Sequence, residues 1–229
     1  MKKNGVSAQP DLSVIIPTIN EEKSIGGTIR SVKKSLKDVK HEILIIDTNS
    51  ADSTVKIAKS LGAKVINEPQ RGYGRAYKTG FRHAKGSLIA TLDADSTYPV
   101  EDMMKLVRLL KKNSADFVSG MRIRSSGMSP LHRLGNWMIT TTANVLFFTR
   151  FKDSQSGMWV FRRRLLKKLD LTDNSWPFSG EIKIEAWRHG KFVEVPIIYR
   201  KRRGESKVRS WKVGWENIKF LFRKRFGVS

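Results

Sequence analysis

The sequence predicts an α/β fold in which helices flank a mostly parallel β-sheet. Apolar, β-branched runs alternate with helical patterns through the first half of the chain, which is typical of βαβ units. Hydrophobic residues make up 39% of the 229 residues and charged residues 28%, which favours a globular domain over a disordered chain. This length lies in the usual range of one domain with one core. We therefore expect a single domain.

The predicted elements follow one another in βαβ order. Continuous apolar runs predict strands in the first half at residues 12–16, 42–46, 64–67, 87–92 and 116–119. Helices are predicted at 22–38, where apolar residues recur at helical spacing, at 52–61, at 75–84 and after Pro99. The second half has a looser pattern, which predicts helices near 131–148 and 180–189 and strands near 158–161 and 192–199.

The two ends of the chain differ from the predicted domain at 12–207. Residues 1–11 are expected to be a disordered tail, and they lack the apolar run of a secretory signal. Residues 208–229 are predicted to form a basic amphipathic helix with Trp211, Trp215, Ile218 and Phe222 on one stripe. Basic residues flank the stripe, so the helix is interpreted as lying on anionic lipid. The alternative is a terminal helix that packs this stripe on the core.

The formal net charge of +23 results from 44 Lys and Arg against 21 Asp and Glu. Such an excess indicates a polyanionic partner, which is nucleic acid, a phosphorylated substrate or an anionic lipid surface. The lack of cysteine excludes disulfides, thiolate metal sites and cysteine nucleophiles, and it fits a reducing compartment. The most apolar stretch, 134–148, contains two asparagines, so we expect no membrane span.

Polar side chains gather where the predicted strands end, which is where ligands bind in such sheets. Asp93 and Asp95 follow the strand at 87–92, and hard oxygen ligands at this spacing suit Mg²⁺ or Mn²⁺ with diphosphate. The alternative is a solvated acidic turn that caps the next helix. Asp47 and Asn49 are candidates for hydrogen bonds to a nucleobase or ribose. Their alternative role is an N-cap for the helix at 52–61.

The segment Gly72-Tyr73-Gly74-Arg75 favours contact of its backbone and its cation with phosphates. The alternative is an ordinary turn before the helix at 75–84. A dinucleotide site would need G-x-G-x-x-G directly after the first strand. Here the third position is Tyr77 and the segment follows the third strand, which argues against NAD. The four histidines lack the spacing of a metal pair or an evident triad partner, so we interpret them as structural or surface residues.

The order of these motifs resembles that of the family-2 inverting glycosyltransferases, which have the Rossmann-like GT-A fold, and in particular the dolichol-phosphate or polyprenyl-phosphate mannose and glucose synthases. The resemblance covers roughly residues 12–207. Its motifs are Val14-Ile15-Ile16-Pro17-Thr18-Ile19-Asn20-Glu21, Asp47-Thr48-Asn49-Ser50, Gly72-Tyr73-Gly74-Arg75-Ala76, Asp93-Ala94-Asp95, Ser119-Gly120-Met121-Arg122, Asp153-Ser154-Gln155-Ser156-Gly157-Met158 and Gly204-Glu205-Ser206-Lys207. Singly most of these motifs are weak, but in this order and at these distances they are specific.

The resemblance implies an activity, ligands and site residues. Such a protein transfers mannose or glucose from a GDP- or UDP-hexose to polyprenyl or dolichyl phosphate, with Mg²⁺ or Mn²⁺, as a peripheral protein on the cytoplasmic, inner face of an anionic membrane. Residues 12–125 are then the nucleotide-sugar and metal half, and residues 126–207 the acceptor half. The implied nucleotide-sugar-binding residues are Pro17, Ile19, Glu21, Asp47, Asn49, Gly74, Arg75, Ala94, Lys201 and Lys207. The implied catalytic residues are Asp93, Asp95, Arg122 and Arg133, of which Asp93 and Asp95 hold the metal.

The acceptor decides whether a general base is needed. A hydroxyl of a soluble molecule or a glycan would need one, and the candidates are Glu181, Glu185 and Asp153, whose alternative role is a helix face or cap. A lipid monophosphate needs none, because its second ionisation lies near pH ~6. A nucleic-acid-binding module is the remote alternative. No recognised binding motif supports it, so no nucleic-acid partner is expected.

Overall fold

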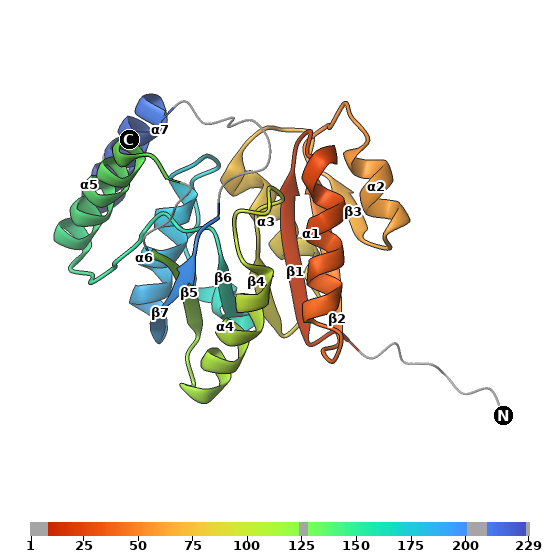
Figure 1. The fold of residues 1–229 in the computed structure, drawn as a ribbon. Coiled ribbons are helices and arrows are strands. Elements are labelled where there is room, and N and C mark those ends of the chain that lie inside the picture. The colour runs from red at the N-terminus through yellow and green to blue at the C-terminus, as the bar shows by residue number, and fades with distance from the viewer. Residues whose placement is uncertain (1–8, 124–127, 201–209, 228–229) are drawn as a thin grey trace.

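Strands and helices alternate along the chain as predicted. The computed structural model describes residues 9–123, 128–200 and 210–227 (Figure 1). Lys201, Lys207 and residues 1–8 of the predicted N-terminal tail lie outside the described residues. The strands are β1 (Leu12–Thr18), β2 (His41–Asp47), β3 (Lys64–Asn67), β4 (Leu88–Thr91), β5 (Phe117–Ile123), β6 (Trp159–Arg162) and β7 (Phe192–Ile198). The helices are α1 (Glu22–Ser35), α2 (Thr54–Ser60), α3 (Tyr73–His83), α4 (Val100–Lys112), α5 (Pro130–Phe147), the 3-10 helix η1 (Arg163–Lys168), α6 (Phe178–His189) and α7 (Ser210–Phe226).

One mostly parallel sheet organises the described part of the chain. Its seven strands have the order β3-β2-β1-β4-β6-β5-β7. Strand β6 runs antiparallel to both β4 and β5, whereas the other neighbouring strands run parallel. The predicted fold class is therefore confirmed. Because β1, β2 and β4 are parallel, their carboxyl ends lie at the same edge of the sheet, and Thr18 pairs with Asp47 there.

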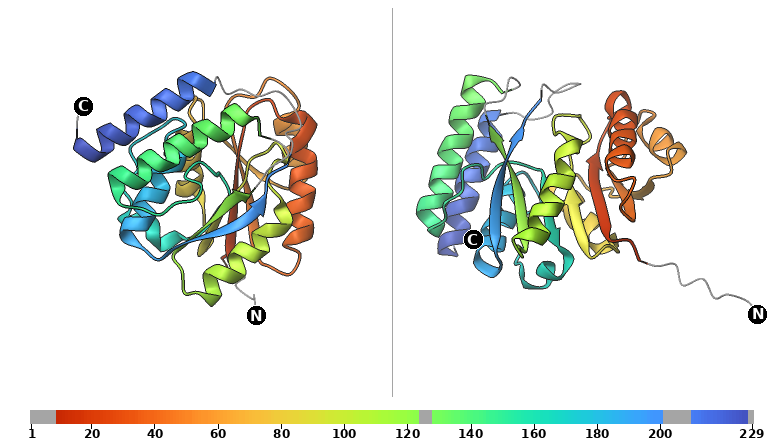
Figure 2. Two further views of the ribbon diagram at one scale, coloured as in Figure 1. Left: turned by 60° about the vertical axis from the view of Figure 1, so that its left-hand side comes forward. Right: turned by 60° about the horizontal axis from the view of Figure 1, so that its bottom comes forward.

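Helices cover both faces of this sheet (Figures 1 and 2). Ile25 and Ile29 of α1 and Leu106 of α4 belong to one core cluster with residues of β1, β2 and β4. On the other face, Tyr77 of α3 and Phe178 of α6 belong to a second cluster with aromatic residues of β5 and β6. Helices α5 and α7 lie side by side beyond α6, where a third, smaller cluster joins the three helices (Figure 2).

Helix α7 packs on the domain mainly through residues outside the predicted stripe, and among the four stripe residues Ile218 alone joins the core contact. Phe220 and Leu221 are buried against α5 and α6. Trp211, Trp215 and Phe222 remain exposed, with 78%, 61% and 47% of their surface accessible. The alternative, in which the stripe packs on the core, is therefore wrong for these three side chains, whereas Ile218 is half-buried and packs against the cluster that contains Phe220. Contact of this stripe with lipid stays a prediction.

Candidate active site

The turn after β2 is tied to the end of β1 through the carboxylate of Asp47. This carboxylate accepts hydrogen bonds from Thr18 Oγ1 at 2.9 Å, from Ser50 Oγ at 2.6 Å and from the Ser50 backbone at 2.9 Å. It does not cap α2, because Ser53 occupies the N-cap position of this helix and no side chain makes a capping hydrogen bond there. The alternative role of Asp47 as the N-cap of this helix is therefore wrong. Asp47 is buried, and its hydrogen bonds fix the conformation of the turn.

Two asparagines in the left-handed conformation complete this edge of the site. Asn20 has φ 51° and Asn49 has φ 48°, a region that asparagine tolerates better than most residues. The Asn20 side chain accepts a hydrogen bond from the Ala51 backbone at 2.8 Å, which joins the turns that follow β1 and β2. The predicted nucleoside residues Pro17, Ile19 and Glu21 are half-buried beside these turns. The structure thus brings this part of the predicted set together.

Asp93 and Asp95 follow β4 at the same edge of the sheet. Asp95 is buried, and its Oδ1 accepts hydrogen bonds from the backbone of Thr97 at 3.1 Å and from Thr97 Oγ1 at 2.6 Å. The Ala94 carbonyl accepts a bond from Thr28 Oγ1 at 3.0 Å. Helix α4 begins after Pro99 with no side-chain cap. The alternative role of these aspartates as caps of that helix is therefore wrong.

Gly157 allows Tyr73 and Asp93 to approach the same point. A Cβ atom at residue 157 would lie 2.7 Å from Tyr73 Oη and 3.4 Å from Asp93 Oδ1, which is too close to the tyrosine oxygen. Gly157 also donates its backbone N–H to Tyr98 Oη at 2.8 Å. Burial, and then the charge of Asp93, raise the pKa of Tyr73 well above its usual range, so its hydroxyl stays protonated. The Tyr73 hydroxyl is a site group that the sequence analysis did not single out.

The Arg122 and Asp153 side chains form a buried, bidentate ion pair. Nε and Nη2 of Arg122 donate to the two Asp153 carboxylate oxygens at 2.7 and 2.8 Å, and the Arg122 backbone donates at 3.0 Å. The guanidinium carbon lies 5.4 Å from the centre of the Tyr199 ring, within cation–π range. Burial alone would raise the pKa of Asp153, but Arg122 lowers it well below its usual range. Asp153 is therefore poorly suited to act as a general base at neutral pH.

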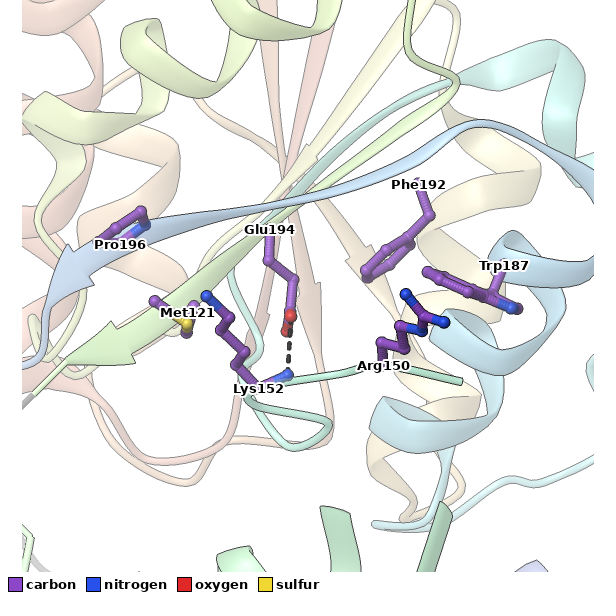
Figure 3. Close-up of a pocket in the computed structure, with 7 residues that line it drawn as sticks. All are labelled: Met121, Arg150, Lys152, Trp187, Phe192, Glu194 and Pro196. Carbon is purple, nitrogen blue, oxygen red and sulfur yellow. Dashed lines mark hydrogen bonds between the residues drawn. The ribbon is translucent and has the colours of Figure 1, made fainter. Parts of the chain in front are cut away.

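A pocket of about 350 Å³ brings Arg122, Asp153 and Arg133 together. Arg133 and the exposed Trp137 line it from α5. A second pocket, of about 270 Å³, is lined by Met121, Arg150 and Trp187 among others, and Lys152 lines both pockets. Figure 3 shows the Glu194 side chain of β7 directed at the backbone of Lys152. Trp187 lies beside Phe192 and Arg150 at the right of this view. Two neighbouring pockets thus have basic side chains in their walls.

Lys183 lies fully buried behind the ion pair and was missed by the sequence analysis. Its Nζ donates to the Asp153 backbone carbonyl at 2.7 Å. The Glu194 carboxylate accepts bonds from the backbones of Lys152 and Asp153 at 2.7 and 3.1 Å. Burial lowers the pKa of Lys183 to about 8, although Asp153 and Glu194 act in the opposite direction. Glu194 therefore binds the backbone N–H groups of residues 152 and 153, and Lys183 binds the carbonyl of residue 153.

We expect Lys183 to make stability depend on pH in the alkaline range. Lysine in the unfolded chain binds its proton up to about pH 10.5, whereas folded Lys183 loses it near pH 8. The unfolded state therefore binds more protons between these values, and the free energy of unfolding rises with pH there by at most about 1.4 kcal/mol per unit. Urea unfolding at several pH values should show this rise for the wild type relative to Lys183→Met. Parallel pH profiles of the two proteins would contradict it.

The glycine-rich start of α3 faces another loop instead of presenting its backbone to a ligand. The backbone N–H groups of Gly74 and Arg75 donate to the Ser175 and Asn174 carbonyls at 3.2 and 3.1 Å. A Cβ atom at Gly74 would lie 2.8 Å from the Asp173 carbonyl, so only glycine permits this packing. The helix therefore begins at Tyr73 instead of at Arg75. Arg75 Nε is buried and makes no hydrogen bond within the described residues.

Glu181 and Glu185, two predicted base candidates, lie buried in a hydrogen-bonded cluster. Glu181 accepts bonds from the backbones of Thr172 and Asp173 at 2.9 and 3.0 Å, and Lys224 of α7 donates to it at 3.0 Å. Glu185 accepts a bond from the Asp170 backbone at 3.1 Å and lies 3.4 Å from Lys224 Nζ. Neither side chain has more than 2% of its surface exposed. The structure therefore separates them from solvent.

A family model described as Glycosyl transferase family 2 matches residues 13–170, which is more than half of the chain. The chain belongs to this glycosyltransferase family. A low-salt glycan biosynthesis hexosyltransferase of Haloferax volcanii is 36% identical over 220 residues, 93% of this chain and 53% of the relative. The present chain thus spans about half the length of that relative. A dolichyl-phosphate hexose transferase of the same organism is 35% identical over 201 residues, 86% of this chain and 86% of the relative.

A solved structure places the chain in the GT-A fold of this glycosyltransferase family. Glucosyl-3-phosphoglycerate synthase from Mycobacterium tuberculosis, crystallised with Mn²⁺, UDP and glucosyl-3-phosphoglycerate, matches with a TM-score of 0.79. The match covers 97% of this chain and 82% of that chain at 19% identity. This likeness concerns the fold. The predicted GT-A architecture, with a mostly parallel sheet flanked by helices, is confirmed.

The residues at the end of β4 fit a divalent metal of the hard class. Asp93 and Asp95 supply carboxylate oxygens, which Mg²⁺ and Mn²⁺ prefer. Within the described residues there is no group of three His, Cys, Asp or Glu that could hold a metal by itself. Two carboxylates are enough for a metal such as Mg²⁺, which usually takes one or two protein carboxylates and completes its shell with water and substrate phosphates.

Proposed function

We propose that the protein is an inverting hexosyltransferase that transfers mannose or glucose from a GDP- or UDP-hexose to polyprenyl or dolichyl phosphate. The observation that carries this proposal is the pair Asp93 and Asp95 at the carboxyl edge of a GT-A sheet. The similarity to a dolichyl-phosphate hexose transferase supports the acceptor class. The bound Mn²⁺ and UDP in the mycobacterial neighbour are consistent with a metal and a nucleotide donor.

At the donor end, the turns after β1 and β2 receive the nucleoside and the end of β4 receives the diphosphate. Asp93 and Asp95 would hold a divalent metal, and such a metal would supply positive charge opposite the leaving diphosphate. Arg75 remains the cation that the sequence predicts for the donor phosphates, and its Nε makes no hydrogen bond within the described residues. The Tyr73 hydroxyl beside Asp93 stays protonated and can donate a hydrogen bond there. Displacement at the anomeric carbon proceeds in line with the departing diphosphate.

At the acceptor end, Arg122 and Arg133 orient the phosphate of the lipid. Both residues line the pocket of about 350 Å³. Arginine suits this role because its planar fork matches phosphate oxygens. A phosphate monoester is its own nucleophile, so no protein base is required. Asp153 is paired with Arg122, and Glu181 and Glu185 are buried, which favours this acceptor over the alternative hydroxyl of a soluble molecule or glycan.

We further propose that the protein acts as a peripheral protein on the cytoplasmic, inner face of an anionic membrane. Within the described residues, no helix combines the length and the apolar character of a bilayer span. Helices α5 and α7 lie side by side and expose large apolar side chains: Leu131, Leu134, Trp137, Met138 and Val145 on α5, and Trp211, Trp215, Phe222 and Phe226 on α7. Such a surface with basic neighbours favours contact with anionic lipid. Trp137 also lines the acceptor pocket, which would place that pocket at the lipid surface.

Transfer of radiolabelled sugar from a panel of GDP- and UDP-hexoses into an organic-extractable product tests the proposal. We expect label in the organic phase only with polyprenyl phosphate and with Mg²⁺ or Mn²⁺, and loss of label when the metal is chelated. Donor turnover with all label in the aqueous phase would move the acceptor to a hydroxyl. No interaction with any nucleotide sugar would refute the proposed activity.

A further inference from the structure

One basic residue of α7 is directed into the domain instead of toward solvent. The Lys224 side chain is 8% exposed, while its neighbours Arg223 and Arg225 are exposed. Its Nζ donates to Glu181 Oε1 at 3.0 Å and to the Asp170 carbonyl at 2.9 Å. A buried ammonium is stable only where carboxylates and carbonyls replace its water. Lys224 therefore has a structural partner set that the prediction of a lipid-facing basic helix did not include.

Glu181 connects Lys224 to the loop at 170–176 through hydrogen bonds. Besides Lys224, its carboxylate accepts bonds from the Thr172 backbone, from Thr172 Oγ1 and from the Asp173 backbone, at 2.9, 2.9 and 3.0 Å. Asp173 in turn accepts a bond from the Ser175 backbone at 2.6 Å. These bonds fix two consecutive N–H groups on one buried carboxylate. Loss of its cation would leave that carboxylate charged without its buried counter-ion, which weakens the whole arrangement.

The same loop supports the start of α3. The carbonyls of Asn174 and Ser175 accept the first N–H groups of this helix, as described above. Lys78, one turn further along, donates to the Thr172 carbonyl at 3.2 Å. Trp176 stacks on Tyr73, with their ring centres 4.8 Å apart. The position of Tyr73 therefore depends on the loop that Glu181 holds.

We propose that Lys224 is a positioning residue for the donor end of the site, acting through Glu181, the loop at 170–176 and Tyr73. Tyr73 Oη and the Asp93 carboxylate flank Gly157, so a displaced loop alters the surroundings of Asp93. The assignment rests on the proposed function in one respect, which is that Asp93 faces the donor diphosphate. It gives the C-terminal helix a role inside the catalytic domain in addition to its proposed role at the membrane.

Hydrogen exchange of the full chain tests the structural part of this coupling without requiring activity. In Lys224→Met we expect faster exchange of the amides at 172–175 and of Gly74 and Arg75, while strand β4 keeps its protection. Glu181→Gln keeps the side-chain shape and should accelerate the same segments. Lys112→Met removes one charge from an exposed position at the end of α4 and should change neither. Acceleration confined to α7 in Lys224→Met would overturn the proposal.

Kinetics test the functional part. We expect Lys224→Met to raise KM for the donor by roughly 2- to 30-fold, with a smaller effect on KM for the lipid. Lys224→Arg should recover part of the loss. The double variant with Glu181→Gln should be less impaired than the sum of the two single variants. An unchanged donor KM in a folded Lys224→Met protein would overturn the proposal, whereas absence of transfer in the wild type would refute the proposed function and leave the exchange result interpretable.

Discussion

Asp95→Ala is expected to abolish glycosyl transfer while the fold persists. The carboxylate lies at the end of β4, where the proposed metal must offset the charge of the leaving diphosphate. Removal of an electrostatic contact of this kind typically lowers kcat by roughly 100- to 1000-fold, and the loss of a metal ligand should be at least as severe. The isosteric Asp93→Asn should give a similar loss. Single-turnover assays with radiolabelled donor, together with circular dichroism, would measure both properties.

A matched control separates the metal role of Asp95 from its role in the turn. Asp95 Oδ1 accepts two hydrogen bonds from Thr97, one from the backbone and one from the side chain. Thr97→Val removes the side-chain bond and keeps the carboxylate, so it should retain most of the activity and still require the metal. Full activity of Asp95→Ala would exclude the proposed metal site. Equal losses of transfer activity in Asp95→Ala and Thr97→Val would show that activity depends on the conformation of the turn and not on Asp95 as a metal ligand.

The sequence was sufficient for those features that follow from local pattern. Apolar runs located β1, β2 and β4, and the polar residues that follow them lie at one edge because parallel strands end together. The alternatives for Asp47 and for Asp93 with Asp95, all helix caps, were excluded only by the structure. Helix α2 has Ser53 at its N-cap position and α4 begins after Pro99, in both cases without a side-chain cap. Short polar turns do not show in sequence which of two neighbouring carboxylates faces the helix.

The features that the sequence did not predict depend on distant contacts. Lys183 lies in α6, whose first nine residues are all buried. Only the fold shows that its ammonium group donates a hydrogen bond to the Asp153 carbonyl. Nothing in the sequence distinguishes Lys224 from the other basic residues near the C-terminus. In the structure it forms ion pairs with Glu181 and Glu185 of α6. Glu181 and Glu185 matched a base by residue type and are buried. Pairing across more than 40 residues is set by packing, which single-sequence periodicity does not record.

Asp153→Ala is expected to destabilise the protein by about 3–5 kcal/mol, because it leaves the Arg122 guanidinium buried without its counter-ion. Both side chains are less than 10% exposed. Glu101→Gln, which breaks the exposed pair with Arg200, should cost less than about 1 kcal/mol by comparison. Arg122 lowers the pKa of Asp153, so the unfolded chain takes up this proton first on acidification. The contribution of the pair is therefore present at neutral pH and is lost as the pH falls below about 4.

Replacing both partners separates the structural role of this pair from its role at the acceptor. The double variant Arg122→Met with Asp153→Leu removes both charges of the pair and leaves Glu194 as the carboxylate that acts on buried Lys183, so it should recover part of the stability that Asp153→Ala loses. It should not recover transfer, because the guanidinium that we assign to the acceptor phosphate is absent. Urea unfolding and transfer assays on the same preparations would measure the two effects. Recovery of both stability and transfer would show that Arg122 only supports the fold, and the acceptor phosphate would then depend on Arg133 and Lys152 within the shared pocket.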